Sequence, residues 1–196
     1  MIQKIKQFIK SPGFREWLDA AKVALILFLI IRTFVVQAFK IPTGSMIPTL
    51  KVGDMLLVSK FWYGAKIPFT DMRLPGLSKP KRGDVMVFLY PVDKKRDFIK
   101  RIVGLGGETI EIKDGKIYAD DKVIDDIKIS QRFYYNRGQY ASNGRKIQVP
   151  ENSYFVLGDN SASSHDSRYW GFVSKDYLIG KAFVIYWPPN RIRLIK

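Results

Sequence analysis

Two stretches decide the fold: residues 84–90, DVMVFLY, and residues 110–118, IEIKDGKIY. The first is an apolar run of the length of an ordinary strand. The second alternates apolar and polar residues on both sides of Asp114-Gly115, and this dipeptide between two alternating runs is a strong β-hairpin signal. Both stretches therefore indicate antiparallel β-structure.

Further strands are expected on either side of these two stretches. Short apolar or alternating runs occupy residues 54–58, 97–103, 154–157 and 182–186, and glycine or proline punctuates the intervals. No long helical period follows residue 50. We predict a mostly β fold, an antiparallel barrel-like domain over residues 39–196. A small β insertion is expected at about residues 108–152, where the chain turns polar and tyrosine-rich.

The N-terminal region has a different pattern. Residues 21–39, AKVALILFLIIRTFVVQAF, are apolar over about the length that a membrane-spanning helix needs. Lys22 and Arg32 lie toward its two ends, where long basic side chains can reach the lipid interface. We predict residues 1–38 to be a cytoplasmic N-terminus followed by one transmembrane helix. A cleaved signal peptide or a helix lying on the membrane surface are the alternatives.

Basic residues precede this segment and suggest its orientation: Lys4, Lys6, Lys10 and Arg15. An excess of positive charge marks the cytoplasmic side, so residue 40 onward is expected outside. Over all 196 residues, 33 Lys and Arg against 18 Asp and Glu give a net charge of +15. This charge favours anionic lipid or nucleic acid as a partner. Because no nucleic-acid motif accompanies it, we expect no nucleic-acid partner.

Cysteine is absent and His165 is the only histidine. This excludes disulfides, thiolate chemistry and a zinc site of ordinary type. We therefore predict neither a metal nor a cofactor.

Three segments contain residues that could perform catalysis. In residues 41–50, IPTGSMIPTL, Gly44 lets the chain turn and expose Ser45, although a polar linker would look similar. In residues 97–103, Lys100 shares a strand face with Phe98 and Ile102, and burial there would lower its pKa. A solvated lysine on an edge strand is the alternative. Residues 158–168, GDNSASSHDSR, are either a polar loop or a shell that supports a catalytic base.

Taken together and in this order, the segments resemble the signature regions of type I signal peptidases, the bacterial leader peptidases. The resemblance runs through residues 39–50, 82–84, 97–107 and 158–173. An apolar anchor just before the serine segment is also typical of that family. The similarity covers most of the architecture, and residues 115–150 are its least typical part.

The resemblance implies a role for each of several residues. Ser45 would attack the scissile carbonyl, and uncharged Lys100 would be its base. Thr43 would share the oxyanion hole with the Ser45 backbone N–H, and Ser164 would orient the lysine. Three charged residues would support the site structurally: Asp159, Asp166 and Arg168. Six apolar residues would form the walls of the substrate pocket: Phe39, Ile41, Met46, Leu50, Phe98 and Ile99.

By the same resemblance, the chain would be a membrane-bound serine endopeptidase that removes signal peptides from exported preproteins. Cleavage would follow small residues at positions −1 and −3, through an acyl-enzyme on the Ser-Lys dyad. The expected location is the bacterial cytoplasmic membrane, with the N-terminus in the cytoplasm and the catalytic domain outside. A monomer that acts near the secretion translocon is expected.

Other interpretations compete with this one. His165 beside Asp166 suggests a Ser-His-Asp triad, but adjacent side chains of an extended chain point to opposite faces. A soluble self-cleaving Ser-Lys protease would lack the anchor, and a membrane-tethered β domain could bind an anionic polymer instead. The aromatic run at residues 61–63 is either core or a membrane-contacting patch.

Overall fold

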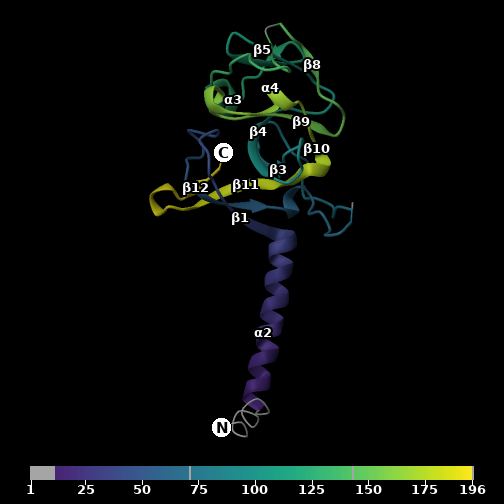
Figure 1. Ribbon diagram of the computed structural model, residues 1–196, viewed down its shortest axis with the longest axis vertical. Helices are drawn as coiled ribbons and strands as arrows, with labels where there is room; N and C mark the ends of the chain where they lie inside the picture. The colour runs from purple at the N-terminus through teal and green to yellow at the C-terminus, as the bar shows by residue number, and fades with distance from the viewer. Residues whose placement is uncertain (1–11, 71, 143, 196) are drawn as a thin grey trace.

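The computed structural model describes residues 12–70, 72–142 and 144–195. Two antiparallel sheets lie beyond the end of a long N-terminal helix (Figure 1). The helices are α2 (Pro12–Ile30), α3 (Ile127–Ser130) and α4 (Ser167–Trp170), with a π-helical turn at Ile31–Val35 and 3-10 turns at Phe61–Tyr63, Ser161–Ser163, Lys175–Tyr177 and Pro189–Arg191.

The larger sheet has eight strands and carries the candidate site. Its path is β1-β2-β11-β3-β4-β9-β10, and β12 pairs with β11. The strands are β1 (Val36–Lys40), β2 (Met55–Ser59), β3 (Val85–Leu89), β4 (Asp97–Gly104), β9 (Ser153–Leu157), β10 (Val173–Ser174), β11 (Leu178–Trp187) and β12 (Arg193–Leu194). All of its pairings are antiparallel, which confirms the mostly β, antiparallel part of the predicted fold class.

The expected barrel-like arrangement is not found. Among the residues that the structure describes, the larger sheet keeps two ends, β1 and β10, and does not close on itself. Local apolar and alternating patterns in the sequence predict individual strands well. Closure of a barrel depends on pairing between its first and last strands, and these local patterns do not encode that pairing.

The smaller sheet has the order β7-β6-β5-β8. Its strands are β5 (Thr109–Lys113), β6 (Lys116–Ala119), β7 (Lys122–Val123) and β8 (Ile147–Gln148). Asp114 and Gly115 have positive φ angles of 51° and 75°, as a tight two-residue hairpin requires, and Ile112 pairs with Ile117 across the turn. Buried residues of this sheet share one core with Phe155 and Leu157 of β9, so the two sheets pack together.

The N-terminal apolar stretch does not form one helix as predicted. Helix α2 ends at Ile30, and residues 36–38, predicted as the end of the helix, are part of strand β1. The reason is main-chain pairing with β2, in which Phe39 lies opposite Leu56. No helix of the described part of the chain has both the length and the apolar character needed to cross a membrane. Lys4, Lys6 and Lys10 of the predicted cytoplasmic N-terminus lie outside the described residues.

Two cores lie on opposite faces of strand β4. Ile99 packs against a cluster that includes Met46 and Leu50, whereas Phe98 and Ile102 belong to a cluster built around Phe88. This is the alternation expected of a strand that is buried on both faces. One core therefore holds the segment that contains Ser45, and the other lies beside Lys100.

The aromatic run at residues 61–63 is divided between core and surface. Tyr63 is buried and donates a hydrogen bond to Asp84 at 2.8 Å, and this contact raises the pKa of its phenol beyond the effect of burial alone. Phe61 and Trp62 remain exposed, at 37% and 39%. Each of the two interpretations of this run therefore holds for part of it.

Substitution of Gly115 by Ala tests the hairpin. A Cβ at Gly115 would lie 2.2 Å from the Phe133 ring, and the φ of 75° is strained for alanine. Because the exposed Phe133 ring must shift as well, Gly115→Ala should lower the free energy of unfolding by roughly 2 kcal/mol, measured by urea denaturation of the full chain in detergent.

The matched control is Gly53→Ala, because Gly53 has a φ of 92° and nothing within 4 Å of an added Cβ. This variant should lose only about 1 kcal/mol, the cost of backbone strain alone. Equal losses in the two variants would contradict the proposed clash with Phe133.

Candidate active site

Ser45 and Lys100 meet in the interior of the larger sheet. The Lys100 Nζ lies 2.8 Å from the Ser45 Oγ, and it also donates to the Ile99 carbonyl at 3.0 Å. Ser45 is 7% exposed and Lys100 is 4% exposed. The serine comes from the turn after β1 and the lysine from the middle of β4. The structure thus brings together two groups that are 55 residues apart.

Burial lowers the pKa of Lys100 from 10.5 to about 8. Loss of hydration is the main cause, because it disfavours the ammonium form. Arg168 lowers the pKa further, whereas the carboxylates of Asp166 and Asp159 oppose the shift. The alternative of a solvated edge lysine is therefore wrong, since β4 is an interior strand between β3 and β9. Neutral Lys100 is accessible near pH 8 and lies within reach of the serine proton.

Ser164 lies next to this pair but does not complete it. Its side chain is 6% exposed, and within the described part of the chain its Oγ has no hydrogen-bond partner. Gly158 packs against it so closely that an added Cβ would lie 2.2 Å from the Ser164 Oγ and 2.5 Å from the Ser45 carbonyl oxygen. The hydroxyl is thus held beside the nucleophile segment, and its orienting role stays a prediction.

Asp166 and Arg168 form a fully buried ion pair. The Arg168 Nε and Nη2 donate to the two Asp166 oxygens at 2.8 and 3.0 Å. Asp166 also accepts from the Gly158 backbone N–H at 3.0 Å, and Arg168 donates to the Ser164 carbonyl at 3.2 Å. The pair therefore holds both ends of the loop that carries Ser164.

Asp159 is held by a residue that the sequence analysis did not single out. The Arg101 Nε and Nη2 donate to the Asp159 carboxylate at 2.8 and 2.7 Å, and both side chains are completely buried. Arg101 also donates to the Gly83 carbonyl at 2.5 Å. Its place next to Lys100 in a strand with apolar neighbours was the available signal, because a charge inside a buried strand needs a partner.

Asn160 supports the serine turn directly. Its backbone N–H donates to the Ser45 carbonyl at 3.0 Å, and its Nδ2 donates to the Gly44 carbonyl at 3.1 Å. The sequence offered no signal for this contact beyond the position of Asn160 in the polar loop. These two bonds hold the peptide groups on both sides of the Ser45 Cα.

The predicted oxyanion and pocket residues have several environments. Thr43 is exposed at the surface of the serine turn. Five of the six pocket residues gather in one apolar cluster: Phe39, Ile41, Met46, Leu50 and Ile99. Met46 and Leu50 are fully buried, so the partly exposed Phe39 and Ile99 are the members that reach the surface. Phe98 packs in the other core and lies 5.5 Å below the Lys100 Nζ.

His165 is not placed to serve as a base. It is exposed, its ring stacks on Tyr169, and its Nε2 lies 3.2 Å from the Tyr90 hydroxyl. The hydrogen bond thus goes to Tyr90, while Asp166 is occupied by Arg168. The Ser-His-Asp interpretation has no geometric support.

Comparisons with known proteins found similar sequences over most of the chain. A sequence profile of the family "Signal peptidase, peptidase S26" matches residues 14–187. The chain is 37% identical to a "Probable signal peptidase I-2" of Synechocystis sp., over 95% of this chain and 80% of that protein. It is 33% identical to a "Signal peptidase I" of Pseudomonas aeruginosa, over 96% of this chain and 78% of that protein.

A solved structure is also similar, a signal peptidase I from Enterococcus faecalis. It has 31% identity and a TM-score of 0.44, and it covers 54% of this chain and 98% of that one. The profile match over most of the chain and the long alignments with curated relatives establish the family. The chain belongs to the signal peptidase family, peptidase S26.

Proposed function

We propose that this chain removes N-terminal signal peptides from exported preproteins, with Ser45 as nucleophile and neutral Lys100 as general base. The curated relatives are named signal peptidases, which supports the substrate class. The observation that carries the mechanism is the distance of 2.8 Å between the Lys100 Nζ and the Ser45 Oγ, with both groups buried. A lysine is an effective base only where burial keeps it neutral.

In the proposed reaction, neutral Lys100 takes the proton of Ser45 while the Ser45 oxygen attacks the carbonyl carbon after residue −1. The resulting oxyanion would accept hydrogen bonds from the Ser45 backbone N–H and the Thr43 hydroxyl. Lys100 then gives its proton to the leaving amine, and the carbon–nitrogen bond breaks. Water, deprotonated by the same lysine, hydrolyses the ester and restores Ser45.

The proposed cleft is bordered by strand β1 and the end of β4. β1 is the first strand of the sheet path, so an extended signal peptide could add to its outer edge through main-chain hydrogen bonds. Phe39 and Ile99 would contact the peptide, and buried Ile41, Met46 and Leu50 would fill the space beneath. Because these buried side chains already fill the space beneath the cleft, only small preprotein side chains would fit at positions −1 and −3.

Attachment to the bacterial cytoplasmic membrane is the second part of the proposal. The large apolar side chains of α2 between Val23 and Ile30 are 47–57% exposed, and no residue of that helix is buried by the rest of the chain. Such a surface needs an apolar partner, which lipid supplies. The catalytic part would lie outside the cytoplasm and act as a monomer near the translocon, where signal peptides emerge.

The first prediction about this mechanism concerns Ser45 and Lys100. With a preprotein carrying an Ala-X-Ala site, Ser45→Ala and Lys100→Ala should each lower the cleavage rate at least about 10³-fold, because each removes one half of a dyad that acts as a unit. The measurement is the appearance of mature protein on a gel, with the cleavage site read by mass spectrometry.

His165→Ala is the matched control and should keep activity within a few-fold, since its side chain is exposed and bonded to Tyr90. Cleavage that survives Lys100→Ala but is lost in His165→Ala would overturn the mechanism.

The second prediction is a pH dependence. Because Lys100 must be neutral and its pKa is about 8, kcat/KM should be low below pH 7, rise through about pH 8 and level off above it. The value of kcat/KM should rise with pH because the fraction of Lys100 in its neutral form rises with pH. A rate profile between pH 6 and 10 checks this. A midpoint near 6.5 that disappears in His165→Ala would contradict it.

The third prediction concerns Thr43. Thr43→Val keeps the shape of the side chain but removes its hydroxyl donor, so kcat should fall by about 10²-fold with KM little changed. Thr43→Ser restores the donor and should regain most of the rate. Equal rates for the valine and serine variants would show that the Thr43 hydroxyl plays no part in the oxyanion hole.

A further inference from the structure

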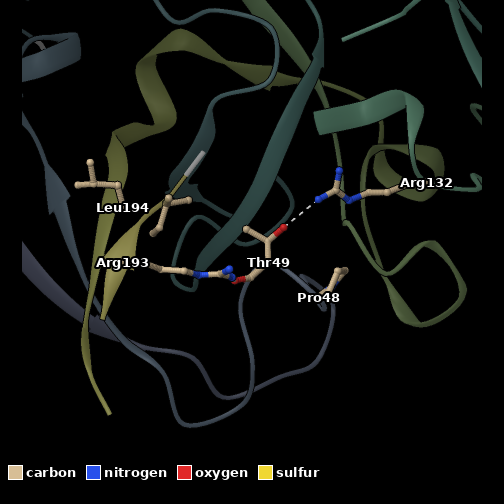
Figure 2. A pocket seen from close by; sticks show the side chains of 6 residues that line it. Pro48, Thr49, Arg132, Arg193 and Leu194 are labelled. Atoms are coloured by element: carbon tan, nitrogen blue, oxygen red, sulfur yellow. Dashed lines mark hydrogen bonds between the residues drawn. The ribbon is translucent and has the colours of Figure 1, made fainter. Parts of the chain in front are cut away.

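A second pocket lies behind the serine turn, separate from the Ser45–Lys100 pair. It has a volume of about 610 Å³ and is lined by Pro48, Thr49, Arg132, Arg193, Leu194 and Ile195. Figure 2 shows the two arginines approaching Thr49 from opposite sides. Arg132 comes from the chain after α3, and Arg193 comes from β12. Three parts of the chain that are far apart in sequence thus meet at Thr49.

Thr49 bridges the two guanidinium groups. Its hydroxyl oxygen accepts from the Arg132 Nη2 at 2.9 Å, and its carbonyl oxygen accepts from the Arg193 Nη2 at 2.6 Å (Figure 2). The hydroxyl also donates to the Asp159 carboxylate. These contacts hold two planar donor groups at the same pocket, each with further N–H groups available, since a guanidinium carries five.

Positive charge exceeds negative charge at this place. Asp159 is the carboxylate shared by Arg101 and Arg132, and its contact with Arg132 measures 3.2 Å. Within the described ranges, Arg193 has no carboxylate at ion-pair distance. Nearby Asp54 is bound by Arg191, at 2.6 Å. Arg193 nevertheless lies close enough to Asp54 to help lower the pKa of that carboxyl. The residues that line the pocket thus include two guanidinium groups and no carboxylate.

Arg132 reaches the pocket with a side chain that is 16% exposed, and its Nη2 is the donor to Thr49. Guanidinium groups pair best with oxyanions, because their fork matches two oxygens of a carboxylate or phosphate.

We propose that the pocket formed by Thr49, Arg132 and Arg193 binds an oxyanion, a phosphate group first of all. Two converging guanidinium groups, with no carboxylate in the lining, favour the more highly charged group. Pro48, Leu194 and Ile195 provide an apolar wall that suits a phosphate carried on an apolar body. Because Thr49 belongs to the turn that contains Ser45, an occupied pocket would also stabilise that turn.

Thermal unfolding of the full chain in detergent tests the proposal, with inorganic phosphate as the probe. At constant ionic strength, replacing chloride by 50 mM phosphate should raise the Tm of the wild type by about 3 °C, since a ligand that binds only the folded state stabilises it. The Arg193→Gln variant should show less than a third of this rise in Tm. The Arg193→Lys variant keeps the charge but lacks the planar guanidinium, so its rise in Tm should lie between those of Arg193→Gln and the wild type.

Arg145→Gln is the matched control, because Arg145 is an exposed arginine near the smaller sheet whose side chain donates to the Gln139 carbonyl and lies over the Tyr140 ring, away from Thr49. It should keep the full shift. An identical shift in Arg193→Gln and wild type would mean a general salting effect and overturn the site, as would no shift at all in the wild type.

Hydrogen exchange of the wild-type chain supplies a second readout, which does not require any substituted variant to fold. Phosphate should slow exchange of the Leu50 amide, which donates to the Met46 carbonyl within the turn, by several-fold. Comparison with a short-chain phosphatidic acid at the same concentration distinguishes the sources. A larger shift with the lipid identifies a lipid headgroup, whereas an equal shift identifies the free anion.

Discussion

The buried pair of Arg101 and Asp159 fixes the relation between two segments on which the whole site depends. Two charges without access to water cost several kcal/mol each to desolvate, and only good geometry and further hydrogen bonds offset that cost. The bidentate contact with both Asp159 oxygens meets this requirement, and Thr49 and Arg132 add further contacts to Oδ2. Arg101 follows Lys100 in the chain, and Asp159 follows Gly158. Once the pair has formed, the lysine strand and the loop after β9 cannot slide past each other.

The electrostatic environment of Lys100 is a balance that burial dominates. Asp166 and Asp159 lie close enough to favour the ammonium, but each carboxylate is already engaged by an arginine. The pairing weakens their effect on the lysine, so desolvation prevails and the pKa falls. The second ion pair, Asp166–Arg168, thus has two roles. It holds the loop that carries Ser164 in place. It also offsets the negative charge of Asp166, which would otherwise favour the protonated form of Lys100.

Sequence patterns predicted the strands more reliably than their arrangement. Alternation and the Asp114-Gly115 turn located most strands of both sheets, since these signals are local. The division of the apolar N-terminal segment between α2 and β1 was missed, because residues 36–39 are apolar enough for either and only pairing with β2 decides. For the site, Ser45 and Lys100 were predicted from the family resemblance of their segments, since each segment alone left an alternative open. Arg101, Asn160 and the Thr49 contacts were not, because their roles arise from partners more than 50 residues away.

Because the pKa of Lys100 depends on burial, the protonation state of this lysine differs between the unfolded and the folded chain. In an unfolded or newly made chain, this lysine is hydrated, has an ordinary pKa and is protonated at physiological pH. The proposed base would therefore form only when β3, β4 and β9 have assembled around it. On the proposed mechanism, a partly unfolded chain would carry Ser45 without a working base, and its reactivity would depend on completed tertiary structure.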